Sequence, residues 1–337
     1  MRTVLLVEPY RLKRVETAPP ERNPGEALVR VLRIGVCGTD LHAFRGRQPY
    51  FTYPRILGHE LAVEVVEVDR GETRVSAGDH CVVMPYLSCG TCIACRAGKT
   101  NCCSSLKVLG VHVDGGMRDL ITVPVENLIR GDGLSLEQMA LVENQSIGAH
   151  AVRRAAPVPG ETALVVGAGP IGIGVIQAAK ARGARVIAAD VSQDRLSFCR
   201  ERLGVEEVID AAGDVAAELA RMTGGEMAPL VFDATGHPGS MERSFDFVSS
   251  GGRLVFVGLV QADIRLHDPE FHRRELTLYA SRNATREDFE WVMGAMRRGD
   301  VAVDPLITHT IAFDDLVDSF ERLTSPETKA IKAMVAL

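Results

Sequence analysis

Short apolar runs rich in β-branched residues alternate with turns between about residues 25 and 130. The runs read EALVRVLRIGV, LAVEVVEVD, HCVVMPY and LITVPVENLI. Glycine, proline and aspartate mark the segments between them, as in ERNPGE and VSAGDH. Short strands separated by such turns predict an all-β unit, which we expect to close into a barrel.

The pattern changes after residue 160. The segment ETALVVGAGPIGIGVIQAAKARGARVIAAD predicts a buried strand, a glycine turn, an alanine-rich helix and a second strand. Further strand candidates follow: EEVIDA, PLVFDATG, GGRLVFVGL and ELTLYAS. Alternating strands and helices indicate a parallel, doubly wound sheet. Beyond about residue 282 we expect an amphipathic helix in REDFEWVMGAMRRGD and a strand in AIKAMVAL.

The glycine turn GAGPIG follows an apolar run and opens a helix, which is the context that a dinucleotide-binding fingerprint requires. Gly167 would permit the tight bend, Gly169 would let a pyrophosphate approach the backbone, and Gly172 would allow close helix–strand packing. The helix N-terminus then presents free N–H groups to the phosphates. Asp190 ends the next strand, where its carboxylate can bind the adenosine ribose. The alternative is a glycine turn that serves packing alone.

Composition and charge narrow the possible functions. The chain has 337 residues, with 38 Lys and Arg against 44 Asp and Glu, so its formal net charge is −6. Because neither sign forms a long run, we expect no nucleic-acid or membrane partner. The N-terminal segment lacks the apolar core of a secretory signal, and no apolar stretch approaches the roughly 18 residues of a membrane span. We therefore expect a cytoplasmic protein whose thiols stay reduced.

Five of the eight cysteines fall within SCGTCIACRAGKTNCC. Reduced thiols argue against a disulfide knot. Four of these cysteines have the spacing C-x2-C-x2-C-x7-C, which can bring four thiolates around a zinc ion in a closed, structural site. They are Cys89, Cys92, Cys95 and Cys103. An iron–sulfur cluster is the competing interpretation, and Cys102, beside the last of the four, is ambiguous.

Two other stretches, GVCGTDLHAF and YPRILGHELAVEV, contain a second group of possible metal ligands. Cys37, His59 and Glu60 together can supply three ligands to a zinc ion that keeps a fourth position open. Such an ion polarises an alcohol oxygen and lowers its pKa. Taken singly, each residue has a plainer interpretation, as a buried thiol, a core histidine or a solvated glutamate.

These motifs, in this order, resemble the zinc-containing medium-chain dehydrogenase/reductase family: CGTD-x-H, P-x-x-x-GHE, the four-cysteine lobe and the glycine fingerprint. The resemblance implies an α/β protein with a GroES-like β-barrel catalytic domain and a doubly wound Rossmann domain. It places the catalytic domain at residues 1–148 and 282–337, and the NAD-binding domain at residues 149–281. It also implies catalytic and structural zinc, NAD, and a homodimer or homotetramer.

The resemblance makes Cys37, His59 and Glu60 ligands of the catalytic zinc. Glu143, in LVENQSIGAH, falls where the polyol and sugar branch has a glutamate, and it would be an exchangeable fourth ligand or lie one water away. Its alternative is a carboxylate favoured by the dipole of a helix N-terminus. The asparagine and glutamine that follow Glu143 depart from the Pro-Phe that the sugar-acid branch often has.

Thr39 and His42 match the family's proton relay, in which the substrate hydroxyl gives its proton to Thr39 and then, through the ribose, to His42 and solvent. Asp40 would orient His59 by a hydrogen bond. Thr39 could instead be a turn residue and His42 a surface histidine. The residues assigned to the cofactor are Gly167, Gly169, Pro170, Ile171, Gly172, Asp190, Arg195, Thr235, Gly258 and Asn283.

Three longer stretches are similar to the bacterial L-galactonate and L-gulonate 5-dehydrogenase branch: QPYFTYPRILGHE, KTNCCSSLKVLGVHVDGG and DPEFHRRELTLYASRNAT. They predict oxidation of a secondary hydroxyl on a polyhydroxylated sugar acid. A carboxylate in a water-poor cleft needs a cationic or multiple-donor partner. The candidates are His112, Arg118, and Arg282 with Asn283, each of which could instead have a structural role. The alternatives are a polyol, sugar or L-threonine dehydrogenase, or a non-catalytic zinc-stabilised nucleotide-binding protein.

Overall fold

Two units make up the chain, and the first is built from segments on both sides of the second. The computed structural model describes residues 1–49 and 51–337. Unit 1 comprises Met1–Glu143, Thr285–Arg297 and Ala302–Leu337, and unit 2 comprises Asn144–Ala284 and Arg298–Val301. The domain boundaries expected from the sequence stay a prediction.

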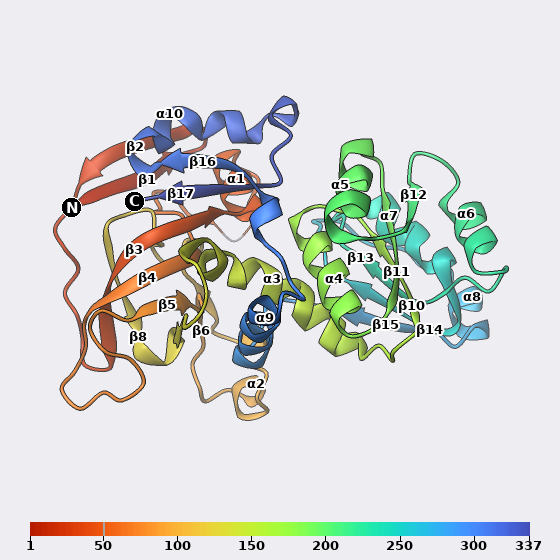
Figure 1. Ribbon diagram of the computed structural model, residues 1–337, viewed down its shortest axis with the longest axis horizontal. Helices are drawn as coiled ribbons and strands as arrows, with labels where there is room; N and C mark the ends of the chain where they lie inside the picture. The colour runs from red at the N-terminus through yellow and green to blue at the C-terminus, as the bar shows by residue number, and fades with distance from the viewer. Residues whose placement is uncertain (50) are drawn as a thin grey trace. The chain divides into compact units, whose positions relative to one another are not determined.

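A mixed sheet forms the centre of unit 1, with the strand order β16-β17-β3-β4-β5-β9 and with β8 paired to β3. Its strands are β3 (Glu26–Val36), β4 (Glu60–Glu67), β5 (His80–Val83), β8 (Leu120–Pro124), β9 (Leu128–Arg130), β16 (Ile307–Ala312) and β17 (Lys332–Ala336). Two smaller antiparallel pairs are β1 (Arg2–Glu8) with β2 (Arg11–Glu16), and β6 (Tyr86–Leu87) with β7 (Lys107–Val108). Figure 1 shows the blue β16 and β17 alongside the orange-red β3.

Apolar side chains from neighbouring strands of this sheet form the core of unit 1. Val29, Val31, Ile34, Leu61 and Val63 are each at most 1% exposed. Burying a side chain of this size stabilises a fold by about 1.5–3 kcal/mol. The four apolar runs do form strands, as their alternation of apolar and polar residues predicts. The all-β interpretation of residues 25–130 needs a correction, because the short helices α1 (Gly38–Phe44) and α2 (Ile93–Arg96) also lie there.

The helices of unit 1 are α1 (Gly38–Phe44), α2 (Ile93–Arg96), α9 (Arg286–Arg298) and α10 (Leu316–Ser319), and α3 (Leu136–Ala155) continues from unit 1 into unit 2. Helix α9 buries Phe289, Val292, Met293 and Met296, the spacing of one helical face. It ends before Gly299, whose φ of +81° lies in the left-handed region that commonly terminates helices.

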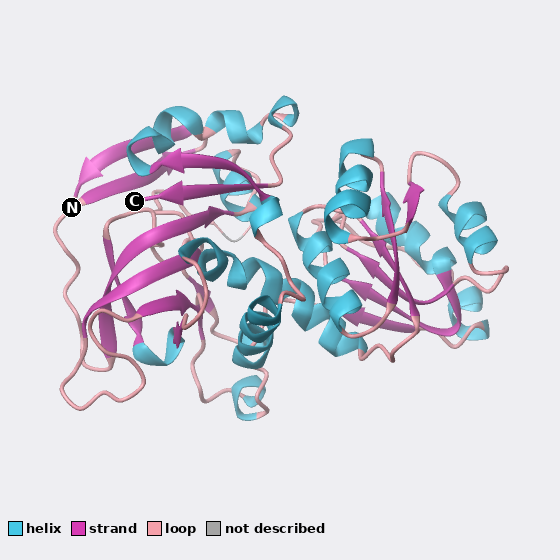
Figure 2. Cartoon of the chain, in the orientation of Figure 1, coloured by secondary structure: helices cyan, strands magenta, loops and turns pink. Residues whose placement is uncertain are grey.

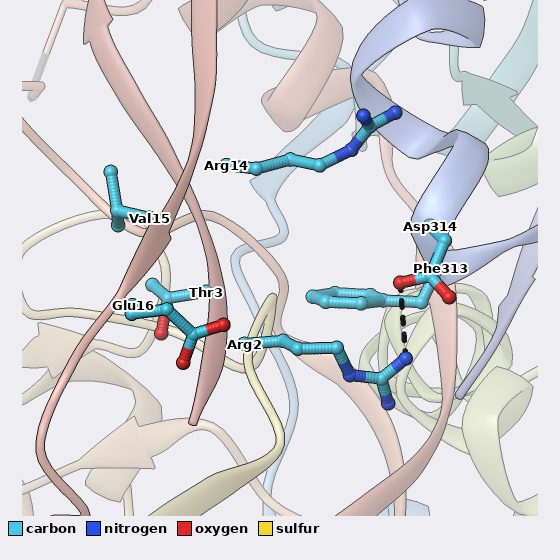
Figure 3. Close-up of a pocket in the computed structure, with 7 residues that line it drawn as sticks. All are labelled: Arg2, Thr3, Arg14, Val15, Glu16, Phe313 and Asp314. Carbon is cyan, nitrogen blue, oxygen red and sulfur yellow. Dashed lines mark hydrogen bonds and ion pairs between the residues drawn. The ribbon is translucent and has the colours of Figure 1, made fainter.

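A parallel sheet forms unit 2, with the strand order β12-β11-β10-β13-β14-β15. Its strands are β10 (Thr162–Val166), β11 (Arg185–Asp190), β12 (Glu207–Asp210), β13 (Ala228–Asp233), β14 (Val248–Phe256) and β15 (Thr277–Ala280). Its helices are α4 (Pro170–Ala181), α5 (Gln193–Leu203), α6 (Val215–Met222), α7 (Pro238–Arg243) and α8 (Asp268–Arg273). Figure 2 shows helices on both faces of this sheet, so the doubly wound fold is confirmed.

The strand order of unit 2 reverses at β10, because the chain runs outward through β11 and β12 and then returns to β13 on the other side. In open α/β sheets, ligands bind at the carboxyl ends of the strands beside such a reversal. The glycine turn that follows β10 lies at this point. In the described part of the chain, no helix has the length and hydropathy needed to cross a membrane.

Candidate active site

Strand β3, which carries Gly35, lies between β4, which carries Glu60, and β17, which carries Lys332. The pairing of these three strands brings Glu60 and Lys332 together. Gly35 of β3 pairs with Glu60 of β4 and with Met334 of β17. A Cβ atom on Gly35 would overlap Oε2 of Glu60 and would lie 3.0 Å from a methyl group of Leu141. The absence of a side chain at Gly35 therefore provides the space that the Glu60 carboxylate occupies.

Lys332 is buried inside unit 1, with a side chain that is 1% exposed. Its ammonium group forms an ion pair with Oε1 of Glu60 and donates a hydrogen bond to the Val36 carbonyl at 3.1 Å. Burial by itself lowers the pKa of Lys332, but the negative charges of Glu60 and Cys37 outweigh it and raise the pKa above its ordinary value. Sequence patterns did not single out Lys332. The feature that could have identified it is a single cationic residue within the apolar segment AIKAMVAL.

Asp40 connects the two segments that carry the expected zinc ligands. Cys37 follows β3 and caps α1, and the fully buried Asp40 accepts the Cys37 N–H at 2.9 Å. The same carboxylate accepts the Gly58 N–H at 3.3 Å and lies 3.9 Å from Nδ1 of His59. Burial works to lower the pKa of His59, yet Cys37 and Asp40 raise it well above its ordinary value. At 3.9 Å no hydrogen bond joins Asp40 to His59, and Nδ1 of His59 has no hydrogen-bond partner among the described residues, so the orienting hydrogen bond expected of Asp40 is not formed here.

The donor atoms of Cys37, His59 and Glu60 all lie within 4.8 Å of one another. Among the described residues, Oε2 of the buried Glu60 has no hydrogen-bond partner. An unpartnered buried carboxylate oxygen is costly unless a cation meets it. A thiolate, an imidazole and a carboxylate are common ligands of zinc. The three residues therefore fit a zinc ion.

Glu143 lies in the second turn of α3, and its Oε1 accepts a hydrogen bond from the phenol of Tyr86. It is not part of the group of three donor atoms described above, but His59 and Glu60 interact with its charge. Burial is the main reason that the pKa of Glu143 is raised. The alternative interpretation of Glu143 as a helix N-terminal carboxylate is wrong, because α3 begins at Leu136 and Glu137 is the acidic residue of its first turn.

Thr39 and His42 lie on α1, three positions apart, and therefore on one face of the helix. Thr39 is half-buried and His42 is exposed. Partial burial lowers the pKa of His42 below its ordinary value, and the charges of Arg45 and Arg47 act in the same direction. The imidazole is therefore neutral near pH 7 and can accept a proton.

The four cysteines of the lobe lie together, with their sulfur atoms all within 4.8 Å of one another: Cys89, Cys92, Cys95 and Cys103. Backbone N–H groups lower the pKa of Cys92 to about 5 and that of Cys89 to about 7, which favours thiolates at these two positions, whereas desolvation raises the pKa of Cys95 to about 11. All eight cysteines are free. Cys102 is exposed and is not part of the group. This donor set fits a closed tetrathiolate zinc site.

The glycine turn of unit 2 leads from β10 into α4. Gly167 has a φ of +93°, a conformation that favours glycine. A Cβ atom on Gly172 would overlap the carbonyl oxygen of Gly167. Gly169 caps α4, Pro170 takes its first position, and Ile171 follows half-buried. The helix N-terminus is thus open to an anion, as a pyrophosphate-binding turn requires.

Asp190, the last residue of β11, connects that strand to the glycine turn. Its Oδ2 accepts the Ala168 N–H at 2.6 Å and its Oδ1 accepts the Ser192 N–H at 2.8 Å. Arg195 lies in the first turn of α5, where its N–H reaches the Ser192 hydroxyl at 3.4 Å. The carboxylate is therefore held at the carboxyl end of the sheet, where a ribose is expected.

Thr235 and Gly258 lie beside the same turn. A Cβ atom on Gly258 would overlap the backbone of Gly236. The Thr235 N–H and hydroxyl both donate to the fully buried Asp233, at 3.0 and 2.6 Å, a carboxylate that sequence patterns did not single out. Asn283 follows β15 with a φ of +52°, and its amide nitrogen has no hydrogen-bond partner among the described residues.

Two of the residues proposed to anchor a substrate carboxylate already have backbone partners. Nδ1 of His112 accepts the Val108 N–H at 3.1 Å, and Nε of Arg118 donates to the Gly115 carbonyl at 3.1 Å. Both residues belong to unit 1, whereas Arg282, which is exposed, and Asn283 belong to unit 2.

Comparison with known proteins identifies the family. Residues 23–132 match the alcohol dehydrogenase GroES-like domain, and residues 170–298 match the zinc-binding dehydrogenase domain. L-galactonate-5-dehydrogenase of Escherichia coli (strain K12) is 41% identical, over 99% of this chain and 98% of that protein. Sorbitol dehydrogenase of Bacillus subtilis (strain 168) is 31% identical, over 96% of this chain and 93% of that protein.

A solved structure agrees with this result. The short chain alcohol dehydrogenase from Escherichia coli CFT073, complexed with NADH, has a TM-score of 0.93 and 29% identity, and the match covers 100% of this chain and 99% of that one. The resemblance inferred from the motifs is confirmed, and with it an oxidoreductase that uses zinc and NAD. The chain belongs to the zinc-containing medium-chain dehydrogenase/reductase family.

Proposed function

We propose that this dehydrogenase oxidises a secondary hydroxyl of a sugar acid such as L-galactonate, with NAD as the hydride acceptor. The observation that carries the proposal is the 41% identity, over nearly the whole chain, to a relative named for L-galactonate. The cluster of Cys37, His59 and Glu60 supplies the matching chemistry, since these residues would hold the catalytic zinc. When bound, zinc lowers the pKa of an alcohol hydroxyl and so favours loss of hydride from its carbon.

Thr39 and His42 carry the proton in this proposal. The Thr39 hydroxyl accepts the proton that the substrate hydroxyl loses, and passes its own proton on. His42 is exposed and has a lowered pKa, so its neutral imidazole can receive that proton and release it to solvent. The hydride leaves with its electron pair to NAD, and the products are a ketone, NADH and a proton.

Asp190 supports NAD rather than NADP. Its two oxygens accept N–H groups from both sides, so the carboxylate is held in place near the expected ribose. A 2′-phosphate at that position would meet like charge without compensation. Arg195 lies in the next helix, α5.

The substrate proposal is tested by comparing aldonates with neutral polyols. NADH formation would be measured with L-galactonate, L-gulonate, sorbitol and L-threonine at the same NAD concentration. A kcat/KM about tenfold or more higher for an aldonate, about 1.4 kcal/mol in transition-state binding, supports the sugar acid. Equal or better activity on sorbitol would contradict it.

A neutral polyol is the second candidate substrate, and one observation favours it. Nε of Arg118 donates to the Gly115 carbonyl, so one N–H group of its guanidinium is already used and is not available to a substrate carboxylate. The similarity to a sorbitol dehydrogenase is consistent with this candidate. The same substrate comparison decides between the two.

A further inference from the structure

Tyr86 is a buried tyrosine beside the metal site that the reaction described above does not use. It is 4% exposed, and its phenol O–H donates a hydrogen bond to Oε1 of Glu143, which is 5% exposed. Both residues belong to unit 1. A phenol that meets a carboxylate in a buried site makes a charge-assisted hydrogen bond, which is stronger than a bond between neutral groups.

The position of Tyr86 is fixed at three points. Its backbone pairs with Val108 in the β6–β7 pair. The buried amide of Asn127 donates to the carbonyls of Met84 and Tyr86, at 2.7 and 3.1 Å. The ring packs edge-on against the fully buried Phe289, with 6.1 Å between the ring centroids. These contacts fix the position of the Tyr86 hydroxyl, which donates to the Glu143 carboxylate.

The two carboxylates of the site are restrained in parallel ways. Oε1 of Glu60 is held by the Lys332 ammonium group, and Oε1 of Glu143 is held by the Tyr86 phenol. In each case the protein engages Oε1, and Oε2 of Glu60 has no hydrogen-bond partner among the described residues. The restraint on Glu60 is a buried ion pair, whereas the restraint on Glu143 is one hydrogen bond from a neutral group, so Glu143 is the more easily released.

We propose that Tyr86 is a positioning residue, which holds Glu143 so that one carboxylate oxygen is available to the metal ion or to a substrate hydroxyl. The inference rests on the proposed function in taking Glu143 as part of the metal site. Without the phenol, Oε1 becomes an unpartnered oxygen in a buried environment, and the carboxylate turns toward the nearest cation. With zinc bound, Glu143 would then be able to offer it two oxygens instead of one, and the position that a substrate needs would be lost.

The test replaces zinc with cobalt(II), whose visible absorption reports the number and geometry of its ligands. Wild type and Tyr86→Phe would be reconstituted with cobalt alone, without substrate. The four-cysteine lobe contributes the same background to both spectra, so a difference reports the second site. We expect weaker absorption in Tyr86→Phe, because a further carboxylate oxygen raises the coordination number. Tyr53→Phe is the matched control, since it removes a phenol hydrogen bond to the Ala43 carbonyl in the same unit.

Kinetics in a double-mutant cycle show whether Tyr86 acts through Glu143. Tyr86→Phe alone should lower kcat by about tenfold to a hundredfold, the range for a hydrogen bond to a charged group. In a Glu143→Gln background the same change should cost less than about twofold, because the group that Tyr86 positions is already altered. A merely structural tyrosine would give the same loss in both backgrounds.

The outcomes separate this inference from the proposed function. If wild type loads cobalt at the second site but Tyr86→Phe has an unchanged spectrum and near-normal kcat, Tyr86 is not a positioning residue and the proposed function stands. If wild type binds cobalt only in the four-cysteine lobe, the metal site itself is wrong and this inference falls with it. Equal losses in the two backgrounds would also overturn it.

Discussion

The active site depends on the lack of a side chain at Gly35. Its position in β3 faces Glu60 on one neighbouring strand and Met334 on the other. A residue with a side chain would compete with the Glu60 carboxylate for the same space. Because the carboxylate is also held by Lys332, it has no alternative position without breaking a buried ion pair.

We therefore expect Gly35→Ala to displace Glu60 and to lower zinc retention in the active site. Overpacking of this kind costs about 1–3 kcal/mol of unfolding free energy. The control is Gly38→Ala in the first position of α1, where a Cβ atom would meet nothing within 4 Å. Alanine favours a helix over glycine, so this variant should be at least as stable as wild type. Zinc content after dialysis against a chelator and thermal unfolding would be measured, and equal zinc retention in both variants would contradict the prediction.

Local motifs made part of the site predictable from the sequence. Cys37, His59 and Glu60 stand in two short stretches whose residue types point to zinc, and the structure brings them together. Lys332 was not predictable in this way, because 272 positions separate it from Glu60 and only the pairing of β17 with β3 brings it near. Tyr86 was missed for the same reason, since its partner lies 57 positions away.

At the scale of elements, the apolar patterns were most informative where a strand or helix buries one face. Strand β3 has the residues of the run EALVRVLRIGV, and α9 follows its amphipathic segment. The β1–β2 pair was not foreseen. Strand β2 reads RLKRVE and buries only Leu12, so it lacks the alternation that marks a strand in the sequence.

The prediction at the scale of elements concerns Asp190, which connects β11 to the glycine turn. Asp190→Asn keeps an acceptor oxygen for one of the two N–H groups but removes the charge, whereas Asp190→Ala removes both. We expect the ratio of kcat/KM with NADP to that with NAD to rise about tenfold in Asp190→Asn, because the repulsion of a 2′-phosphate is gone. Asp190→Ala should in addition weaken NAD binding. Steady-state kinetics with both cofactors would be measured. A wild type that uses both equally well would refute the role of the charge.

At the scale of the whole molecule, both metal sites belong to unit 1 and the nucleotide-binding turn belongs to unit 2. The two metal sites differ in kind. Four thiolates satisfy a zinc ion completely, so the lobe can only stabilise the fold. Three protein ligands at the mixed site would leave a zinc ion a fourth position for a substrate, so loss of this site should affect turnover first.

Metal analysis of wild type should therefore give two zinc ions per chain. Cys95→Ser should lose one zinc and lower the unfolding temperature, whereas Cys37→Ser should lose the other and abolish turnover with a smaller effect on stability. Cys102→Ser is the control and should change neither, because Cys102 is exposed and outside the lobe's donor group. Iron in the lobe, or one zinc in carefully prepared wild type, would show that the assignment is wrong.

The strands that form the sheet of unit 1 are translated at widely separated times. Strands β3 and β4, which carry Gly35 and Glu60, are translated before the whole of unit 2, and Lys332 of β17 is translated after it. While the ribosome makes the intervening residues, Glu60 lacks the Lys332 ammonium group and β3 lacks its pairing with β17. Unpaired strand edges are where growing chains aggregate. Synthesis of unit 1 therefore begins before that of unit 2 and ends after it. During the time between, a free metal ion or a chaperone can bind the incomplete unit 1.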